Sequence, residues 1–186
     1  MLRGLVSAGL LVLSLALAAC ATTSYSAYFD TDPDAPYTLA SGDRLRIIVF
    51  GQDSLSNSYA VDGSGHISMP LIGPVLAEGE TTSSLARKVE ARLRAGYIRD
   101  PRVSIEVEAF RPFFILGEVT TPGQYPYVNG MTAQTAVAIA GGFTPRAYKD
   151  SVDLSRIING HPYTGAVPIL QQIRPGDTIV VRERYF

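Results

Sequence analysis

The stretch Val61-Asp62-Gly63-Ser64-Gly65-His66-Ile67-Ser68-Met69-Pro70-Leu71-Ile72-Gly73-Pro74-Val75 decides how the rest of this chain is interpreted. Its segment from Asp62 to Gly65 can supply the positive φ angles that a tight reversal needs. On either side, apolar residues alternate with small or polar ones: Tyr59 and Val61 come before, and Ile67 and Met69 after. This alternation predicts a β-hairpin over residues 59–69.

Proline and glycine residues interrupt regular strand structure at the end of the same stretch. Pro70 has no backbone N–H to donate to a sheet, and Gly73-Pro74 marks another turn. Leu71-Ile72 is therefore predicted to be a short strand that turns sharply at both ends. A long sheet interior is not expected here.

Residues 1–19 have the pattern of a secretion signal. Arg3 is followed by an almost uninterrupted apolar run from Leu5 to Ala19, shorter than the roughly 20 residues that a membrane-spanning helix needs. Leu17-Ala18-Ala19-Cys20 resembles a bacterial lipobox, in which the cysteine thiol takes up diacylglycerol. We therefore expect Cys20 to be lipidated; the alternative is an ordinary signal peptide followed by an incidental cysteine.

Lipidation of Cys20 would anchor the mature chain to a membrane without spanning it. Each buried methylene contributes roughly 0.8 kcal/mol, so two or three acyl chains hold a protein essentially permanently. Ala21 follows in place of the aspartate that favours the inner membrane among bacterial lipoproteins, which predicts attachment to the outer membrane, facing the periplasm. Cys20 is the only cysteine, so a disulfide within the chain is excluded.

The bulk composition fits a turn-rich protein. The chain has 186 residues, which after removal of the signal leaves room for one large or two small domains. Its 17 glycines and 12 prolines exceed the average share. A formal net charge of −1 gives no bias towards polyanions, and we expect no nucleic-acid partner.

Residues 20–36 are predicted to be a tether between the lipid and the first domain, because they are rich in Thr, Ser, Tyr, Asp and Pro without an apolar period. Tyr25, Tyr28 and Phe29 lie in this segment. They are either docking groups for a neighbouring surface or incidental aromatics, and we expect the second.

Two similar turns stand near the two ends of the folded part. Gly42-Asp43 precedes a strand with Leu45, Ile47 and Val49 on one face, and Gly176-Asp177 precedes the last strand, over residues 178–184. An aspartate in such a turn can accept backbone N–H bonds, which is a structural role. We interpret the two as equivalent devices in two small β-rich domains.

The first domain also contains the best helix of the sequence. It starts near Thr81 and places Leu85, Val89 and Leu93 on one stripe, with Gly96 as a further candidate. Its outer faces are basic and carry Arg87, Lys88, Glu90, Arg92 and Arg94. We interpret these residues as solvated surface charge. The alternative is that they contact an acidic polymer or an acidic partner subunit. Beyond Asp100-Pro101, the alternation of residues 103–107 predicts a half-buried strand.

A second hairpin begins the second domain. Residues 113–119 and 123–128 flank a Thr-Thr-Pro-Gly turn, and residues 132–142 form a short alanine-rich helix closed by Gly141-Gly142. Val152, Leu154 and Ile157 suggest a further strand before the Asn159-Gly160 turn. Two hairpins crossed by one helix make a β-grasp-like unit, and the fold class of the whole chain is predicted to be α+β.

These motifs together resemble the outer-membrane polysaccharide export family, the Wza-type auxiliary proteins. The resemblance covers nearly everything after Cys20. Its structural turn and motif positions are Gly42, Asp43, Asp62, Gly65, Pro70, Gly73, Gly117, Pro122, Gly123, Gly141, Gly142, Gly176 and Asp177. It implies a polysaccharide export-signature domain over residues 37–110 and an SLBB (soluble-ligand-binding β-grasp) domain over residues 111–186.

The resemblance also implies a function and partners. Relatives assemble into a homo-oligomeric periplasmic ring that carries a capsular or exopolysaccharide chain outward. This chain stops at Phe186, without the second β-grasp domain and the C-terminal helix of the best-known members. We therefore expect a lipid-anchored ring that works with a separate outer-membrane β-barrel and an inner-membrane polysaccharide co-polymerase.

Catalysis is not expected from the carboxylates that lie in motifs. A glycan-cleaving enzyme needs two carboxyl groups roughly 5 to 9.5 Å apart, whereas Asp43, Asp62, Glu118 and Asp177 each lie in or beside a turn where backbone capping explains them. His66 and His161 have no third ligand at metal-binding spacing, so neither a metal nor another cofactor is expected. A conduit component, a monomeric glycan-binding adaptor and a hydrolase or lyase remain as the three alternatives.

Overall fold

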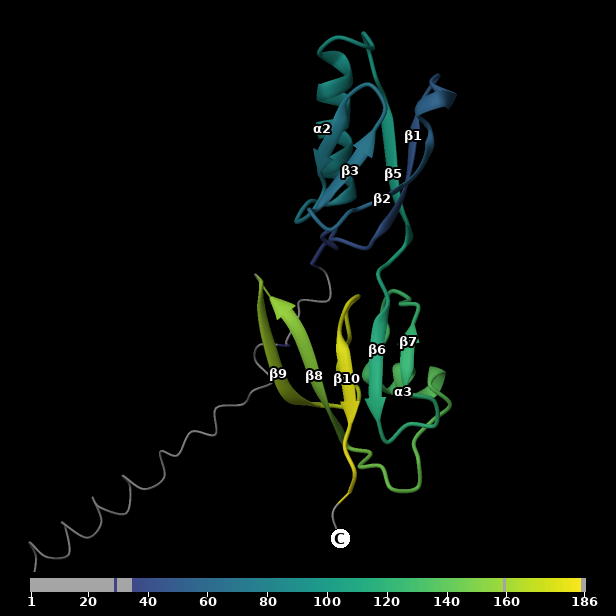
Figure 1. The fold of residues 1–186 in the computed structure, drawn as a ribbon, viewed down its shortest axis with the longest axis vertical. Helices are drawn as coiled ribbons and strands as arrows, with labels where there is room; N and C mark the ends of the chain where they lie inside the picture. Colours follow the sequence, from purple (N-terminus) through teal and green to yellow (C-terminus); the bar gives the residue numbers. More distant parts are fainter. Residues whose placement is uncertain (1–28, 30–34, 159, 185–186) are drawn as a thin grey trace, which may run out of the picture.

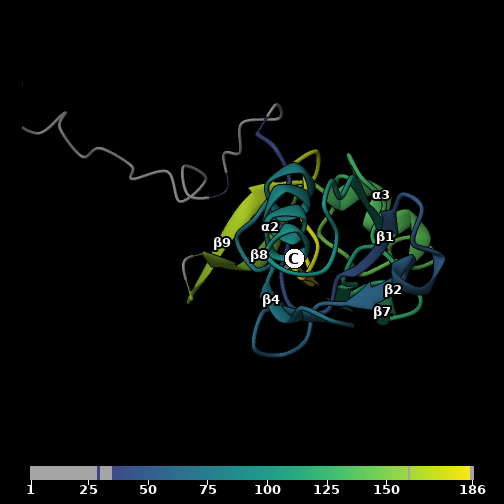
Figure 2. The same ribbon diagram turned by 90° about the horizontal axis from the view of Figure 1, so that it is seen from above.

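The computed structural model describes residues 29, 35–158 and 160–184, which form two hydrophobic clusters in two domains. We call residues 35–110 the N-terminal domain and residues 111–184 the C-terminal domain. The domains are stacked along the long axis of the molecule and joined by the short connection between β5 and β6 (Figure 1). Seen along that axis, elements of one domain project over those of the other (Figure 2).

A three-stranded antiparallel sheet in the order β2-β1-β5 supports the N-terminal domain. Its strands are β1 (Arg44–Val49), β2 (Asn57–Ala60) and β5 (Val103–Ala109), and a short 3-10 helix, η2 (Asp53–Leu55), connects the first two. Alternate residues of β1 are buried, as predicted: Leu45, Ile47 and Val49 are at most 1% exposed.

The hairpin predicted over residues 59–69 is wrong in its pairing. β2 pairs with β1, whereas β3 (His66–Met69) pairs with β4 (Gly73–Leu76) in a separate two-stranded sheet. The predicted Leu71-Ile72 strand is likewise wrong, because these residues form the turn between β3 and β4. Leu71 takes the positive φ of 70° that this turn requires, although it is not glycine.

The helix α2 (Thr82–Arg94) confirms the predicted stripe. Leu85, Val89 and Leu93 are fully buried and pack in one cluster with β1, β3 and β4, and α2 also contacts β5. Thr81 caps the helix through its hydroxyl, which accepts from the Ser84 N–H at 3.1 Å, and Gly96 lies beyond the helix end.

The C-terminal domain is a five-stranded mixed sheet in the order β7-β6-β10-β8-β9, crossed by one helix. Two hairpins flank β10, which runs parallel to β6 and antiparallel to β8. The bounds are β6 (Phe113–Gly117), β7 (Gly123–Tyr125), α3 (Ala133–Ile139), β8 (Ser151–Ile158), β9 (His161–Pro168) and β10 (Thr178–Val181). The β-grasp-like arrangement and the α+β class are confirmed.

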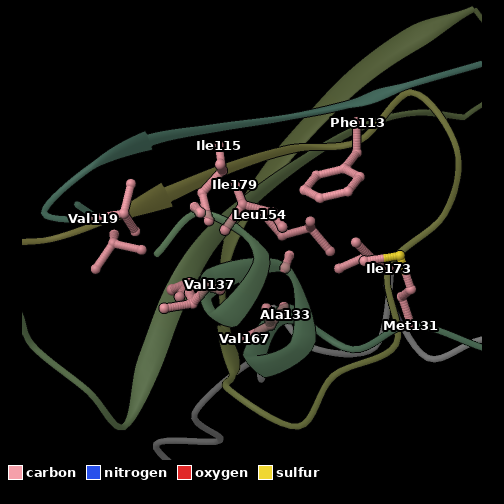
Figure 3. Close-up of a cluster of buried hydrophobic side chains, with 14 of the residues drawn as sticks. Phe113, Ile115, Val119, Met131, Ala133, Val137, Leu154, Val167, Ile173 and Ile179 are labelled. Atoms are coloured by element: carbon pink, nitrogen blue, oxygen red, sulfur yellow. The ribbon is translucent and has the colours of Figure 1, made fainter. Parts of the chain in front are cut away.

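The core of this domain lies between the sheet and α3 (Figure 3). Ile115 and Ile179 from adjacent strands face Ala133 and Val137 of the helix (Figure 3). One strand prediction changes in detail: Ile157 is 73% exposed, whereas its neighbour Arg156 is 5% exposed. Val152, Leu154 and Arg156 alternate inward along β8, so an arginine occupies the position where an apolar residue was expected.

Phe29 is part of the same core, which corrects the expectation that the aromatics of the tether are incidental. Its side chain is fully buried, and its carbonyl accepts a hydrogen bond from Gln171 Nε2 at 2.8 Å. The guanidinium of Arg156 lies over its ring, 5.7 Å from the centroid. Tyr25 and Tyr28 lie outside the described residues.

In the part of the chain that the structure describes, no helix has the length and apolar character needed to cross a membrane.

Candidate functional site at the junction of the two domains

The two aspartate turns are equivalent in three dimensions, as predicted. Asp43 accepts from the N–H of Ala40 at 3.0 Å, and Asp177 accepts from the N–H of Arg174 at 2.7 Å. Each aspartate N–H in turn donates to the carbonyl three residues earlier, at 3.1 Å in both cases. Gly42 and Gly176 take φ angles of 95° and 85°, which glycine adopts without strain.

Each buried aspartate also binds an arginine from a distant part of the chain. Asp177 is 1% exposed and accepts two parallel bonds from Arg156, Nε to Oδ1 at 2.9 Å and Nη2 to Oδ2 at 2.7 Å. Asp43 is fully buried and lies 3.6 Å from the guanidinium of Arg111. The first pair is bidentate and within one domain, whereas the second joins the two domains.

Arg111 connects the two turns. Its N–H donates to Asp43 Oδ1 at 3.0 Å, and its Nη1 donates to the hydroxyl of Tyr37 at 2.9 Å. A Cβ added to Gly42 would lie 3.3 Å from Arg111 Cβ, and one added to Gly176 would lie 2.7 Å from Arg111 Nε. The positive φ angles favour glycine at both positions, and one side chain that lies between the domains approaches both glycines closely.

Three aromatic rings support this junction. Phe110 makes edge-to-face contacts with Tyr37 and Tyr127, at centroid distances of 4.9 Å and 5.5 Å. The Tyr37 hydroxyl donates to Asp43 Oδ2 at 2.6 Å, and burial together with this bond raises the pKa of Tyr37. Burial is also the main reason why the pKa of Tyr127 is raised. Both phenols therefore stay neutral at physiological pH.

Two open clefts lie beside Arg111. The first has a volume of about 430 Å³ and is lined by Tyr37, Tyr127 and Arg174, among others. The second has a volume of about 580 Å³ and runs between the Thr38–Ser41 segment and the end of β8, with Arg156 and Arg174 in its lining. These volumes fall in the range of roughly 300–1,000 Å³ that is usual for small-molecule sites.

Asp62 and Gly65 form hydrogen bonds in the turn that leads into β3. Asp62 Oδ1 accepts from the N–H groups of Ser64 at 2.8 Å and His66 at 3.0 Å, and its bond from the Ser64 hydroxyl is the main cause of its lowered pKa. The carbonyl of Gly65 accepts from two N–H groups, and a Cβ at Gly65 would lie within 2.6 Å of Glu78 Cβ.

The remaining motif residues shape turns away from the junction. Gly117 is required because a Cβ there would lie 2.2 Å from the carbonyl oxygen of Val181. The others lie in or directly beside the β3–β4 turn and the β6–β7 turn, or just beyond the end of α3: Pro70, Gly73, Pro122, Gly123, Gly141 and Gly142. Cys20 lies outside the described residues.

The four motif carboxylates are all held by hydrogen-bond donors. Glu118 accepts from the Thr144 hydroxyl, and the other three accept backbone N–H bonds as described above. The described residues contain no cluster of three or more His, Cys, Asp or Glu side chains that could hold a metal ion. His66 Nδ1 lies within hydrogen-bond distance of Ser64, and His161 is exposed.

Sequence reasoning found the two aspartates but missed the residues that surround them. Tyr37, Arg111, Tyr127, Arg156 and Arg174 were not identified as a group. Arg111 lies 74 positions from Tyr37 and Arg156 lies 21 positions from Asp177, and no local pattern reports such pairs. The duplication of the aspartate turn was one available signal. Each buried carboxylate needs a cationic partner, so two such turns imply two basic residues beside them.

Comparison with known proteins identifies both domains. Residues 31–108 match the family model for polysaccharide biosynthesis/export protein, and residues 112–167 match the model for the SLBB domain. The exopolysaccharide production protein ExoF of Rhizobium meliloti (strain 1021) is 35% identical over 118 residues, covering 57% of this chain and 28% of the relative. Two polysialic acid transport proteins KpsD of Escherichia coli are each 27% identical over 167 residues, covering 82% of this chain and 29% of the relative. The chain thus spans less than a third of the length of these curated relatives.

Proposed function

Residues 31–108 of this chain match the family model for polysaccharide biosynthesis/export protein and residues 112–167 match the SLBB domain model, and from this premise we propose that the protein is a component of a polysaccharide export channel. In this proposal, lipid-anchored copies at the outer membrane form a periplasmic ring that conducts a capsular polysaccharide or exopolysaccharide. An inner-membrane co-polymerase would deliver the polymer, and a separate outer-membrane β-barrel would complete the passage.

The observation that carries the proposal is the presence of both domains in this order. The similar proteins support it, because one is an exopolysaccharide production protein and two are polysialic acid transport proteins. Those proteins are more than three times as long as the matched region, so the ring and its partners are proposed for this chain on the basis of its two domains.

The junction gives this proposal a physical basis. The wall of a ring needs subunits whose domains keep a fixed relative orientation, because each domain must meet its neighbour at the same level. Arg111, Tyr37 and Asp43 bind across the two domains, and Phe110 packs between aromatic rings from both. Such a network favours one orientation.

A monomeric glycan-binding adaptor is the second candidate. The observation that favours it is the pair of clefts beside Arg111, which have tyrosine and arginine side chains in their lining. The adaptor predicts a monomer that binds sugar measurably in solution. The conduit predicts a closed oligomer in which each subunit binds sugar weakly, because a polymer that binds tightly cannot move.

Native mass measurement on the acylated protein, extracted in detergent, separates the two candidates. We expect one closed oligomer of defined subunit number, together with loss of cell-surface polysaccharide when the chain is deleted from its host. A monomer at membrane-like protein densities, with surface polysaccharide unchanged in the deletion strain, would contradict the conduit.

The anchor is tested by Cys20→Ala. Cells grown with an alkyne analogue of palmitate should label the wild-type chain and leave the variant unlabelled, because the chain has no other cysteine that could carry the lipid. The intact mass of the wild-type mature protein should exceed its sequence mass by the diacylglycerol and an N-acyl group. Equal labelling of the two chains, or an unmodified Cys20 in the mature protein, would overturn the proposed anchor.

A further inference from the structure

The two clefts of the junction meet at one exposed arginine. Arg174 lines both of them, together with Thr38, Arg111 and Pro175. It precedes the Gly176-Asp177 turn, which fixes its backbone through the bond from its own N–H to Asp177 Oδ2 at 2.7 Å. The position of Arg174 is therefore set by the fold, while its side chain is open to the solvent.

Arg174 is also the cation of this site that is free to bind a ligand. Arg111 is bound to Asp43 and Tyr37, and Arg156 is bound to Asp177. The guanidinium of Arg174 has no hydrogen bond or ion pair with any of the described residues. Partial burial, and next the nearby charge of Arg156, lower its pKa, which an anion beside it would reverse.

Neither acidic side chain in the lining of the second cleft forms an ion pair with Arg174. Asp177 is 1% exposed and is held by the Arg156 guanidinium and by the backbone N–H of Arg174. Glu78, which also lines this cleft, accepts a hydrogen bond of 3.4 Å from the hydroxyl of Ser41. The cleft thus combines three arginines with two carboxylates, one of which is already paired.

A second observation comes from the buried arginine in the same lining. Arg156 is 5% exposed, and its Nη1 is the one buried side-chain nitrogen or oxygen of the described residues without a hydrogen-bond partner. A buried donor left unpaired typically costs about 1–3 kcal/mol. Arg156 belongs to the lining of the second cleft, which shares Arg174 with the first, so the site includes a second guanidinium whose hydrogen-bonding capacity is not filled.

We propose that the first of the two junction clefts binds a carboxylate-bearing sugar unit, a hexuronate, with its carboxylate on Arg174, where the two clefts meet, and its ring against Tyr127. The carboxylate accepts charge-assisted bonds from the guanidinium. The tyrosine offers an apolar ring face with a polar tip, which suits a sugar that is apolar on one face and hydroxylated at its edge. The inference rests on the proposed function, since it names an acidic polysaccharide as the polymer in transit.

The test is a titration of the isotope-labelled mature chain with tri-galacturonate, followed by NMR. The fully methyl-esterified trisaccharide is the matched probe, because it has the same sugar backbone without the charge. We expect weak binding, with a dissociation constant of about 1 mM, and shifts centred on Thr38, Tyr127 and Arg174. The methyl ester should bind about tenfold more weakly, and raised salt should weaken the binding of the charged form.

Arg174→Gln should weaken tri-galacturonate binding about tenfold, because it removes one charge-assisted interaction from an exposed position. Arg174→Lys keeps the charge but loses the bidentate geometry, so its affinity should lie in between. Arg99→Gln, at an exposed arginine beyond α2, is the matched control and should bind like the wild type.

The proposal would be overturned by any of four results: no binding at tens of millimolar, equal binding of the methyl ester, shifts away from the junction, or unchanged affinity of Arg174→Gln. A titration with acetate at equal concentration tests whether the sugar contributes beyond its carboxylate. Equal affinity for acetate would overturn the proposed recognition of a sugar. The proposal of a closed ring is tested separately, by the native mass of the wild-type protein. The titration measures binding by the chain in solution and does not depend on ring formation. A failure of the ligand proposal and a failure of the ring proposal are therefore distinguishable.

Discussion

Replacing Asp177 by alanine should destabilise the C-terminal domain by about 3–5 kcal/mol, the usual cost of removing one partner from a buried ion pair. The variant leaves the guanidinium of Arg156 buried and without its carboxylate, since Arg156 is 5% and Asp177 1% exposed. It also removes the acceptor of the Arg174 N–H in the turn before β10. Many domains are stable by only 5–15 kcal/mol, so we expect a markedly lowered midpoint in urea.

Asp153→Ala is the matched control for this variant. Asp153 also lies in the β8 sheet and pairs with an arginine, Arg182, at 3.6 Å, but their side chains are 32% and 42% exposed. An exposed pair contributes only about 0–1 kcal/mol. A loss of stability in Asp177→Ala no greater than that in Asp153→Ala would contradict the role assigned to the buried pair.

A double variant tests whether the charge itself causes the loss. Combining Asp177→Ala with Arg156→Met removes the orphaned cation and leaves an apolar side chain over the ring of Phe29. Replacing both members of a buried pair by apolar groups is often neutral or stabilising. The double variant should therefore be more stable than Asp177→Ala alone.

Phe29→Ala should lower the free energy of unfolding by about 3 kcal/mol, the lower end of the range for phenylalanine in a protein core. The side chain is fully buried in the C-terminal domain, although the residue precedes the N-terminal domain in sequence. The truncation leaves a cavity in that core and exposes one face of the Arg156 guanidinium. Urea unfolding of the mature chain, monitored by tyrosine fluorescence, measures the effect.

The control for this variant is Phe50→Ala. Phe50 is 63% exposed at the end of β1, and exposed substitutions of this kind usually change stability by within about 0.5 kcal/mol. If Phe29→Ala and Phe50→Ala unfold at the same urea concentration, Phe29 does not stabilise the C-terminal domain.

Local patterns predicted the elements well. The stripe of α2, the alternation of β1 and β5, the β6–β7 hairpin and the capped helix α3 depend on neighbours within a few residues. The two aspartate turns were equally accessible, because glycine at a positive φ and a carboxylate one residue later form a local motif. Each of these features is encoded by residues that are close in sequence.

Strand pairing was harder to predict, and the stretch 61–75 shows why. Val61, Ile67, Met69 and Val75 are all buried, so the alternation identified the inward face correctly. Alternation does not say which strand is the partner, and β2 pairs with β1 instead of β3. Leu71 at φ 70° was also unpredictable, because β-turn signals rest on glycine and asparagine.

Contacts between distant segments make up the rest of the site. Val152 and Leu154 face inward, so the two-residue period of β8 places position 156 inward and Ile157 outward, and the inward position holds an arginine that pairs with Asp177. Phe29 belongs to a segment whose composition is that of a tether, so only the three-dimensional structure assigns it to a core. The conduit, the lipid anchor and the ligand of the cleft are predictions, which native mass, acyl labelling and titration test respectively.

The insertion of Phe29 also limits how far the protein can stand from the bilayer. A free segment from Cys20 to the first domain at residue 37 could extend over about 55 Å, at roughly 3.3 Å for each residue. With Phe29 fixed in the C-terminal domain, the chain has only nine residue steps from the lipid-bearing position to that domain, and their full extension is about 30 Å. If Cys20 carries the acyl chains, this domain stays within that height of the membrane surface, and every copy in an assembly shares the same limit.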